Sequence, residues 1–435
     1  MRSEWNAATR KISSWGNAAL TRIPQGRSDV SGQRKPDQVV LVLSLCFAAA
    51  LFEGADAVSL GLAAPTLGLV LQIRPTQLGL ALSLTTLGLL VGATAGGRLS
   101  DRIGRKSVLI AAMVVLGLSS LATIVVGSLA QLYVLRTITG LGLGGLLPTL
   151  IAIASEVSGN SRKAGRVGKM FCGVPLGASL LGFLTAGVGL GWRAIFAVCG
   201  VGPLLLALVL AALLPETAPS AALADPGVER APASFFSVLF AERRAARTLL
   251  LWTAAYFTSA AIWILVGWFP SLMVARGFSP FEAANLAALE NLGAATGSVL
   301  VSRTYDVSRP WLIIGITYVG MAVLLMSLAR VSGFLPTAIA GTTCGFFVTG
   351  GQLLLYAMIP HQYPPTGRGT GVGASVAFGR LGSISGPAMV GIMLGSGYGP
   401  SGVFLTMMPC LVVAGAALTL VANKSHGDIQ RFPSG

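Results

Sequence analysis

Charged side chains are scarce in this chain. Asp, Glu, Lys and Arg make up only 10% of its 435 residues, against about 25% in an average soluble domain. Hydrophobic residues account for 54% of the sequence, and the mean hydropathy is +0.77. So little charge cannot cover a water-facing surface, which excludes an ordinary soluble protein and requires that most of the surface face lipid.

Cysteine and histidine are also rare, with five and two residues. All five cysteines lie inside apolar runs and none is spaced as a metal-ligand pair, so we interpret them as packing residues without disulfides; they are Cys46, Cys172, Cys199, Cys344 and Cys410. The sequence contains no catalytic triad, phosphate-binding loop or metal cluster. We therefore expect no enzymatic activity, no cofactor and no metal.

The chain does contain many long apolar runs. Because crossing the lipid core takes about 20 apolar residues in a helix, each run is a candidate span. The runs are continuous rather than alternating, which favours helices over a β-barrel. The sequence thus predicts an all-α membrane protein with twelve transmembrane helices, near 39–64, 77–97, 107–127, 130–155, 168–189, 193–214, 248–273, 281–303, 311–330, 335–359, 369–394 and 401–422.

Lysine and arginine are distributed unevenly about these runs. Of the 30 in the chain, 24 fall on the side that holds both termini and 4 on the other, while Arg136 and Arg380 fall inside predicted helices. The positive-inside rule then places both termini in the cytoplasm. The net charge of +15 is explained by loops that border an anionic leaflet, so no nucleic-acid partner is expected.

The chain divides into two similar parts. We predict a disordered basic tail over 1–37, six-helix bundles over 38–214 and 248–422, a cytoplasmic linker over 215–247 and a cytoplasmic tail over 423–435. Four features recur after 205 or 206 residues, which indicates an internal duplication; the pairs are Gly144-Gly145 with Gly350-Gly351, Glu156 with Gln362, Gly173 with Gly379, and Asp101 with Asp306. Parallel repeats of this kind place a substrate site near the membrane midplane, between the two halves.

The sharpest motif is GRLSDRIGRK, between the second and third predicted helices. It resembles the signature loop of the major facilitator superfamily at every defined position, namely Gly97, Asp101, Arg102, Gly104, Arg105 and Lys106. We interpret it as a latch. Gly97 would permit close helix contact, Gly104 a tight turn, and Asp101 would bind a helix N-terminus and an arginine. The alternative is a basic loop that only fixes topology. The second-half copy, around Asp306, is degenerate.

A second gating feature is expected where the fourth helix ends. Glu156 lies close in sequence to Arg162, Lys163 and Arg166. We expect it to form an ion pair with one of them at the cytoplasmic gate.

Ionisable residues inside predicted helices each cost roughly 2.5–3.5 kcal/mol on insertion scales, so each needs a reason. Glu53 and Asp56 are three residues apart and share a helix face. Two carboxylates so close should not both ionise easily, which suits a proton carrier. The alternative is a purely structural ion pair. Arg136 matches their estimated depth and is expected to pair with one of them and tune proton binding.

The second half carries its own buried charges. Arg380 and Glu290 both lie near the predicted midplane, where they could pair with each other. A guanidinium without such a partner would instead bind a substrate carboxylate in bidentate fashion, and this is the reading we favour for Arg380. Tyr256 and Tyr356 are further candidates for the binding cavity, with helix packing as the alternative. Tryptophans at predicted helix ends fit an interfacial aromatic belt; they are Trp192, Trp268 and Trp311.

Several strings beyond the loop resemble the aromatic acid:proton symporter family, in particular its 3-(3-hydroxyphenyl)propionate transporters. They are EGAD at 53–56, the glycine-rich stretch after Arg136, WFP at 268–270, MFCGVPLGASL, TGGQLLLYA and GVGASVAFGRLGSISGP. The resemblance covers about residues 40–420. It implies proton-coupled uptake of an aromatic acid by alternating access across a bacterial inner membrane, by a protein that functions as a monomer. It also implies that Glu53 and Asp56 carry protons, that Arg136 and Arg380 serve the anion, and that Asp101 serves the gate.

Two other functions share parts of this pattern. A proton-driven exporter would have the same fold, but exporters of the superfamily usually carry a Gly-Pro pair in the fifth helix, and here the pair is split in Gly173-Val-Pro175. A non-transporting membrane sensor would have no use for buried charges, and no signalling domain is attached. Both remain alternatives to uptake.

Overall fold

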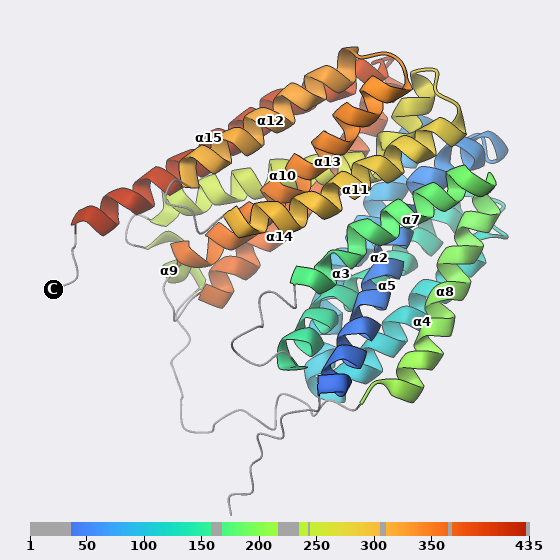
Figure 1. Ribbon diagram of the computed structural model, residues 1–435, viewed down its shortest axis with the longest axis horizontal. Coiled ribbons are helices and arrows are strands. Elements are labelled where there is room, and N and C mark those ends of the chain that lie inside the picture. The colour runs from blue at the N-terminus through green and yellow to red at the C-terminus, as the bar shows by residue number, and fades with distance from the viewer. Residues whose placement is uncertain are drawn as a thin grey trace, which may run out of the picture. The chain divides into compact units, whose positions relative to one another are not determined.

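The structure is a computed structural model that describes residues 36–157, 168–215, 235–241, 244–304, 310–363 and 368–431. Every regular element in these ranges is helical (Figure 1). The elements are α2 (Pro36–Val70), α3 (Pro75–Ile103), α4 (Arg105–Thr123), α5 (Leu129–Val157), α7 (Gly173–Val188), α8 (Trp192–Leu213), α9 (Phe235–Phe240), α10 (Arg244–Ala275), α11 (Pro280–Thr304), α12 (Pro310–Arg330), α13 (Phe334–Met358), η2 (Ile359–Gln362), α14 (Arg368–Gly395) and α15 (Pro400–Arg431).

Within the described ranges, eleven helices are long and apolar enough to cross a membrane. The twelfth predicted span corresponds to α11, which is not among them, although its 25 residues extend about 37 Å at 1.5 Å per residue. Its lower hydropathy follows from the polar residues that it carries, including Glu290 and Asn291. A helix of that kind is expected to contact protein or an aqueous cavity rather than lipid.

The helices repeat one packing pattern in two halves, which we call the first half (α2 to α8) and the second half (α10 to α15). In the first half α3 packs on α5 and α4 on α8, and in the second half α11 packs on α13 and α12 on α15 in the same way. Two further contacts join the halves, α3 with α14 and α7 with α11. These too are equivalent under the duplication predicted from the sequence.

Glycines bring the helix backbones together at these crossings. A Cβ atom added at Gly140 or Gly144 in α5 would lie 2.1 or 2.2 Å from a backbone oxygen of α3, so neither position accepts a side chain without a shift. The equivalent crossing of α11 and α13 uses Gly293 and Gly345 in the same way, with added Cβ atoms 1.8 and 2.0 Å from backbone oxygens. Such close approach is how helices associate when lipid provides no hydrophobic driving force.

Several close contacts between the halves lie near the start of α3 and the end of α7. Near the start of α3, an added Cβ at Gly79 would lie 2.8 Å from the Pro387 oxygen of α14, and one at Gly182 in α7 would lie 2.8 Å from the Ala288 Cβ of α11. The Ser179 hydroxyl donates to the Ala288 carbonyl oxygen at 2.9 Å. This closely packed end is opposite to the loop that joins α3 and α4.

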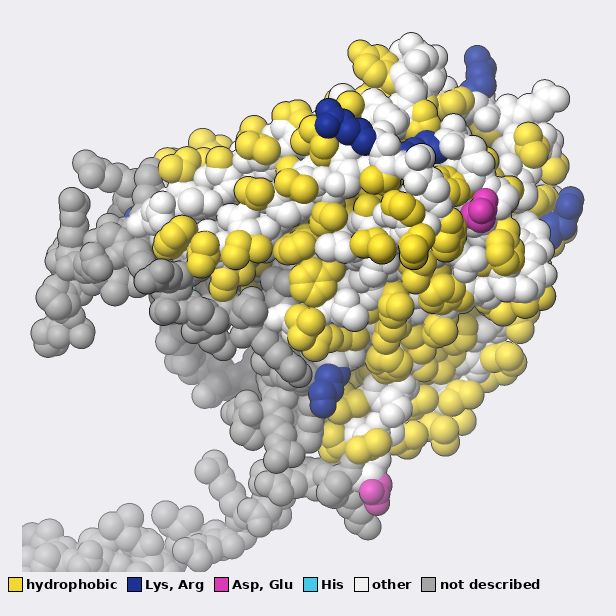
Figure 2. All heavy atoms as spheres, turned by 45° about the horizontal axis from the view of Figure 1, so that its top comes forward, with side chains coloured by type: hydrophobic (Ala, Val, Ile, Leu, Met, Phe, Trp, Pro, Cys, Tyr) yellow, Lys and Arg dark blue, Asp and Glu magenta, His cyan; other side chains and the backbone are white. Residues whose placement is uncertain are grey.

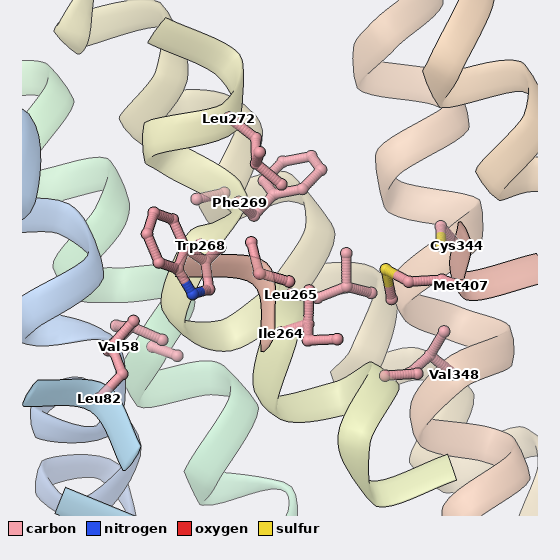
Figure 3. Packing of buried hydrophobic residues seen from close by; sticks show 14 of the residues in the cluster. Val58, Leu82, Ile264, Leu265, Trp268, Phe269, Leu272, Cys344, Val348 and Met407 are labelled. Carbon is pink, nitrogen blue, oxygen red and sulfur yellow. The ribbon is translucent and has the colours of Figure 1, made fainter. Parts of the chain in front are cut away.

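Apolar side chains fill the same region. Figure 3 shows Val58 and Leu82 of the first half facing Leu265 and Trp268 of α10. The Trp268 indole nitrogen donates to the Pro387 carbonyl oxygen at 3.0 Å, and the side chain is only 2% exposed. The expectation of an interfacial position was therefore wrong for Trp268, because its one polar group has a partner inside the protein. Trp192 is also buried, whereas Trp311 is exposed.

The outer surface is apolar. Figure 2 shows a face on which hydrophobic side chains predominate and charged ones are few. Large apolar side chains stand exposed on both halves, among them Leu208 and Val319. A surface of this extent is typical of contact with lipid.

The glycine crossings predict a sharp difference between two substitutions. Gly140→Ala places a methyl group against the Thr85 carbonyl, whereas Gly68→Ala places one in open space. We expect Gly140→Ala to destabilise the protein by about 1–3 kcal/mol, as overpacking usually does, and Gly68→Ala to be neutral or slightly stabilising. Thermal unfolding of detergent-purified variants measures both. Equal melting temperatures would contradict this account of the crossing.

Candidate functional site

A buried ion pair lies inside the first half. Asp56 of α2 and Arg136 of α5 are 2% and 1% exposed, and the Arg136 Nη1 atom is 3.9 Å from the Asp56 Oδ2 atom. The Ser120 hydroxyl of α4 donates to the other carboxylate oxygen of Asp56, at 2.7 Å. The structure therefore chooses Asp56 over Glu53 as the carboxylate that pairs with Arg136.

The guanidinium of Arg136 has further partners on three helices. It donates to the Ser59 hydroxyl at 3.4 Å and to the Thr123 hydroxyl at 3.0 Å, and it lies 4.8 Å from the ring centre of Phe196. Such contacts replace water around a buried cation. The Asp56 Oδ2 atom nevertheless has no hydrogen-bond partner among the described residues.

Glu53 has different surroundings from Asp56. Its side chain is 4% exposed, and its Oε2 atom has no hydrogen-bond partner within the described part of the chain. The charge that acts on it most is Arg380, from α14 of the second half. The two carboxylates lie three residues apart on α2, and of the two only Asp56 forms an ion pair among the described residues.

A cavity of about 240 Å³ lies between the two halves. Three residues singled out from the sequence line it, namely Glu290, Tyr356 and Arg380. Its walls combine aromatic and aliphatic groups with a few polar ones, which is typical of sites for small organic molecules. The other lining residues are Gly54, Ala57, Val58, Leu147, Phe171, Val174, Pro175, Ala178, Ser259, Ile262, Trp263, Val266, Asn291, Ala294, Ser298, Val348, Thr349, Gln352, Leu353 and Ser383.

Arg380 is half-buried on the wall of this cavity. Among the described residues it has neither an ion-pair partner nor a hydrogen-bond acceptor, and in particular it forms no ion pair with Glu290. The pairing of these two side chains, left open by the sequence, is absent from this structure. A guanidinium in such a position is available to a bidentate anion such as a carboxylate.

Glu290 is held by its neighbour. Its Oε2 atom accepts a hydrogen bond of 2.9 Å from the Asn291 amide, which also donates to the Ala287 carbonyl oxygen at 2.9 Å. Asn291, Trp263 and Gln352 also line the cavity and were not predicted from the sequence. The low hydropathy of α11 is the signal that could have pointed to Asn291, while the other two carry none.

Tyr256 lies outside the cavity between the halves. Its hydroxyl is 2.6 Å from the Ser385 hydroxyl, and its ring lines a groove formed by α10, α14 and α15 rather than the cavity between the halves. Tyr356, by contrast, lines the cavity and is 37% exposed near the end of α13. The structure thus brings together only one of the two tyrosines with Arg380.

The signature loop is short, and only some of its charged side chains have a partner. Gly104 alone separates α3 from α4, and its φ of 93° is one that side-chain-bearing residues rarely adopt. Arg105 forms an ion pair with Glu156, and the Lys106 ammonium donates to the Ala211 carbonyl oxygen at 2.8 Å. Glu156 therefore pairs with the loop, while the expected partners Arg162, Lys163 and Arg166 lie outside the described residues.

The contacts expected for Gly97 and for Asp101 are not formed among the described residues in this structure. The space around Gly97 is open, and the close contact is made one residue earlier, where an added Cβ at Gly96 would lie 2.8 Å from Gly145. Asp101 and Arg102 are exposed, and among the described residues Asp101 has no hydrogen bond or ion pair. The second-half copy around Asp306 lies outside the described ranges.

Metal binding has no support in the described ranges, where no three His, Cys, Asp or Glu side chains come together as ligands.

Comparison with solved structures identifies the fold. An inward open form of the xylose transporter XylE from E. coli superposes with a TM-score of 0.70 at 16% identity, over 87% of this chain and 95% of XylE. A bacterial homologue of the human lysosomal transporter Spinster, inward-facing and unoccupied, gives 0.70 at 17% identity, over 89% and 98%. The predicted arrangement of two pseudo-symmetric six-helix halves is thereby confirmed.

Sequence comparisons agree with the fold. A 3-(3-hydroxy-phenyl)propionate transporter of Escherichia coli strain K12 is 40% identical, over 89% of this chain and 95% of that protein. The 4-hydroxybenzoate transporter PcaK of Pseudomonas putida is 31% identical, over 89% and 93%. These relatives are transporters and not enzymes, and a family model described as Major Facilitator Superfamily matches residues 45–332. The chain therefore belongs to the Major Facilitator Superfamily.

Proposed function

We propose that this protein is a symporter that takes up an aromatic carboxylic acid, such as 3-(3-hydroxyphenyl)propionate, together with protons. It would work as a monomer in the bacterial inner membrane, with both termini in the cytoplasm. The observation that carries the proposal is the unpaired Arg380 guanidinium on the wall of a cavity between the halves. The transporters of hydroxylated aromatic acids among its relatives support it.

The cavity suits an aromatic acid in two respects. Arg380 provides one cation for one carboxylate, and its planar fork matches both carboxylate oxygens. Phe171, Trp263 and Tyr356 provide aromatic surface for the ring. In this proposal Tyr256, which lies in another groove, supports helix packing.

The position of Glu53 links the anion to a proton. Arg380 is the charged residue that interacts electrostatically with Glu53. A bound carboxylate would neutralise that charge, and a buried Glu53 without a cation would then take up a proton. Substrate and proton would bind together in this way without touching each other. Asp56 and Arg136 form the second proton-binding group, inside the first half.

The packing between the halves supports alternating access, with this structure as the inward-facing state. The halves meet at the start of α3, which the positive-inside rule places outside, and the cavity reaches the exposed Tyr356 towards the cytoplasmic end. At that end Asp101 is unpaired. In the outward-facing state Asp101 would engage a helix N-terminus of the second half and close the latch.

Arg380 and Arg136 should respond differently to the same substitution. Lysine keeps the charge but loses the bidentate fork. We expect Arg380→Lys to weaken substrate binding by about 1–3 kcal/mol, with little change in pH optimum, because it contacts the carboxylate. Arg136→Lys should shift the pH optimum of uptake more than the affinity. Binding to purified protein over a pH series, beside uptake assays, tests both. Wild-type affinity of Arg380→Lys at every pH would remove Arg380 from the binding site.

Proton coupling is tested in energised cells. Uptake should rise when the external medium is acidified and should collapse when a protonophore is added, since the proton gradient would no longer drive it. Glu53→Gln should abolish this accumulation but retain exchange of labelled for unlabelled substrate. Uptake that follows only the substrate gradient, untouched by the protonophore, would exclude symport.

The latch is tested with Asp101→Asn, which keeps the shape of the side chain and removes its charge. We expect net uptake to be lost while substrate binding from the cytoplasmic side and thermal stability stay as in the wild type, because Asp101 has no partner in this state. Asp37→Asn, another exposed carboxylate, is the matched control. Normal uptake by Asp101→Asn at equal expression would count against a gating role.

A further inference from the structure

The cavity between the halves is lined by one acidic and one basic side chain that the sequence singled out. Glu290 is the carboxylate on its wall, and it lines the same space as Arg380 without forming an ion pair with it. An anionic substrate needs Arg380 alone, and a bare carboxylate beside it would only repel it. Glu290 must therefore face a part of the substrate that differs from the carboxylate.

The hydrogen bonds of Glu290 indicate what that part is. One carboxylate oxygen, Oε2, accepts from the Asn291 amide, while the other has no hydrogen-bond partner among the described residues. Asn291 cannot donate further, because its two amide hydrogens serve Glu290 and the Ala287 carbonyl oxygen. The side chain is 5% exposed and thus nearly fixed. It presents a rigid, unsatisfied acceptor to the cavity, and its complement is a hydrogen-bond donor.

Two hydroxyl groups of the cavity donate hydrogen bonds within the protein. The Ser259 hydroxyl donates to the Gln352 side-chain oxygen at 3.4 Å, and the Ser383 hydroxyl donates to the Gly379 carbonyl oxygen at 3.4 Å. The second carboxyl oxygen of Glu290, by contrast, has no donor among the described residues.

We propose that Glu290, held in place by Asn291, accepts a hydrogen bond from a hydroxyl group on the aromatic ring of the substrate, while Arg380 holds the carboxylate. This rests on the proposed function and refines it. The transported class is a hydroxylated aromatic monocarboxylate, and Glu290 is the residue that distinguishes it from the acid without the hydroxyl. Discrimination of this kind is strong, because the analogue leaves a buried acceptor without a partner.

The test compares three ligands on the purified, full-length protein. They are 3-(3-hydroxyphenyl)propionate, 3-phenylpropionate, which lacks the hydroxyl, and 3-(3-methoxyphenyl)propionate, which cannot donate. We expect the wild type to bind the hydroxy acid at least about tenfold more tightly than either analogue, as the loss of one hydrogen bond by a buried polar group implies. In Glu290→Gln this ratio should fall to about threefold or less, through weaker binding of the hydroxy acid alone.

The matched control is Glu282→Gln on the same helix. Glu282 lies in the first turn of α11, where it accepts hydrogen bonds from Ser279, and it does not line the cavity. Its variant should keep the wild-type ratio. Asn291→Leu, which frees Glu290 but leaves its charge, should give an intermediate ratio and serves if Glu290→Gln does not fold.

The possible failures are distinguishable. If the wild type binds the methoxy acid as tightly as the hydroxy acid, or if Glu290→Gln keeps the wild-type ratio, the role of Glu290 is overturned while the uptake of aromatic acids stands. If the wild type binds none of the three acids, the proposed function itself is wrong. The three-ligand comparison on wild type needs no variant, so the proposal stays testable whatever the stability of the mutants.

Discussion

Close contact between helix backbones is the constraint on which this structure depends. Apolar side chains gain little free energy by moving from lipid into the protein interior. Helices in a membrane therefore associate where small residues let their backbones approach closely. Gly140 and Gly144 do this in the first half and Gly293 and Gly345 in the second. These crossings hold α5 and α11 rigid, and the two helices carry Arg136 and Glu290. The positions of the buried charges thus follow from residues that have no side chain.

The buried charged side chains fall into two groups that differ in how many partners they have within the protein. Arg136 is surrounded by acceptors and by an aromatic ring, all within the first half. Arg380 has no such partners and lines an open space. The contrast separates a charge that the protein stabilises for itself from one that it leaves for a ligand. Glu53 connects the two groups, because it belongs to the helix of Asp56 but responds to Arg380.

The sequence predicted the fold well because each transmembrane helix is a local feature with a strong hydropathy signal. It also singled out most of the charged residues of the site, since a charge in an apolar run needs a function. The contacts that each of these side chains makes could not be predicted from the sequence in this way. The choice of Asp56 for Arg136, the place of Tyr256 outside the cavity and the burial of Trp268 depend on the rotation of each helix about its axis. That rotation is set by contacts such as the one from Trp268 to Pro387, between residues far apart in the chain.

The division of residues between the halves has a consequence for how such a protein can change. The Asp56 and Arg136 network is built from α2, α4, α5 and α8, whereas Arg380, Glu290 and Asn291 come from α14 and α11. In the proposed function, proton binding and substrate recognition would therefore occupy separate copies of the repeated six-helix unit. Substitutions in the second half would then change the transported compound without altering the proton-binding residues of the first half.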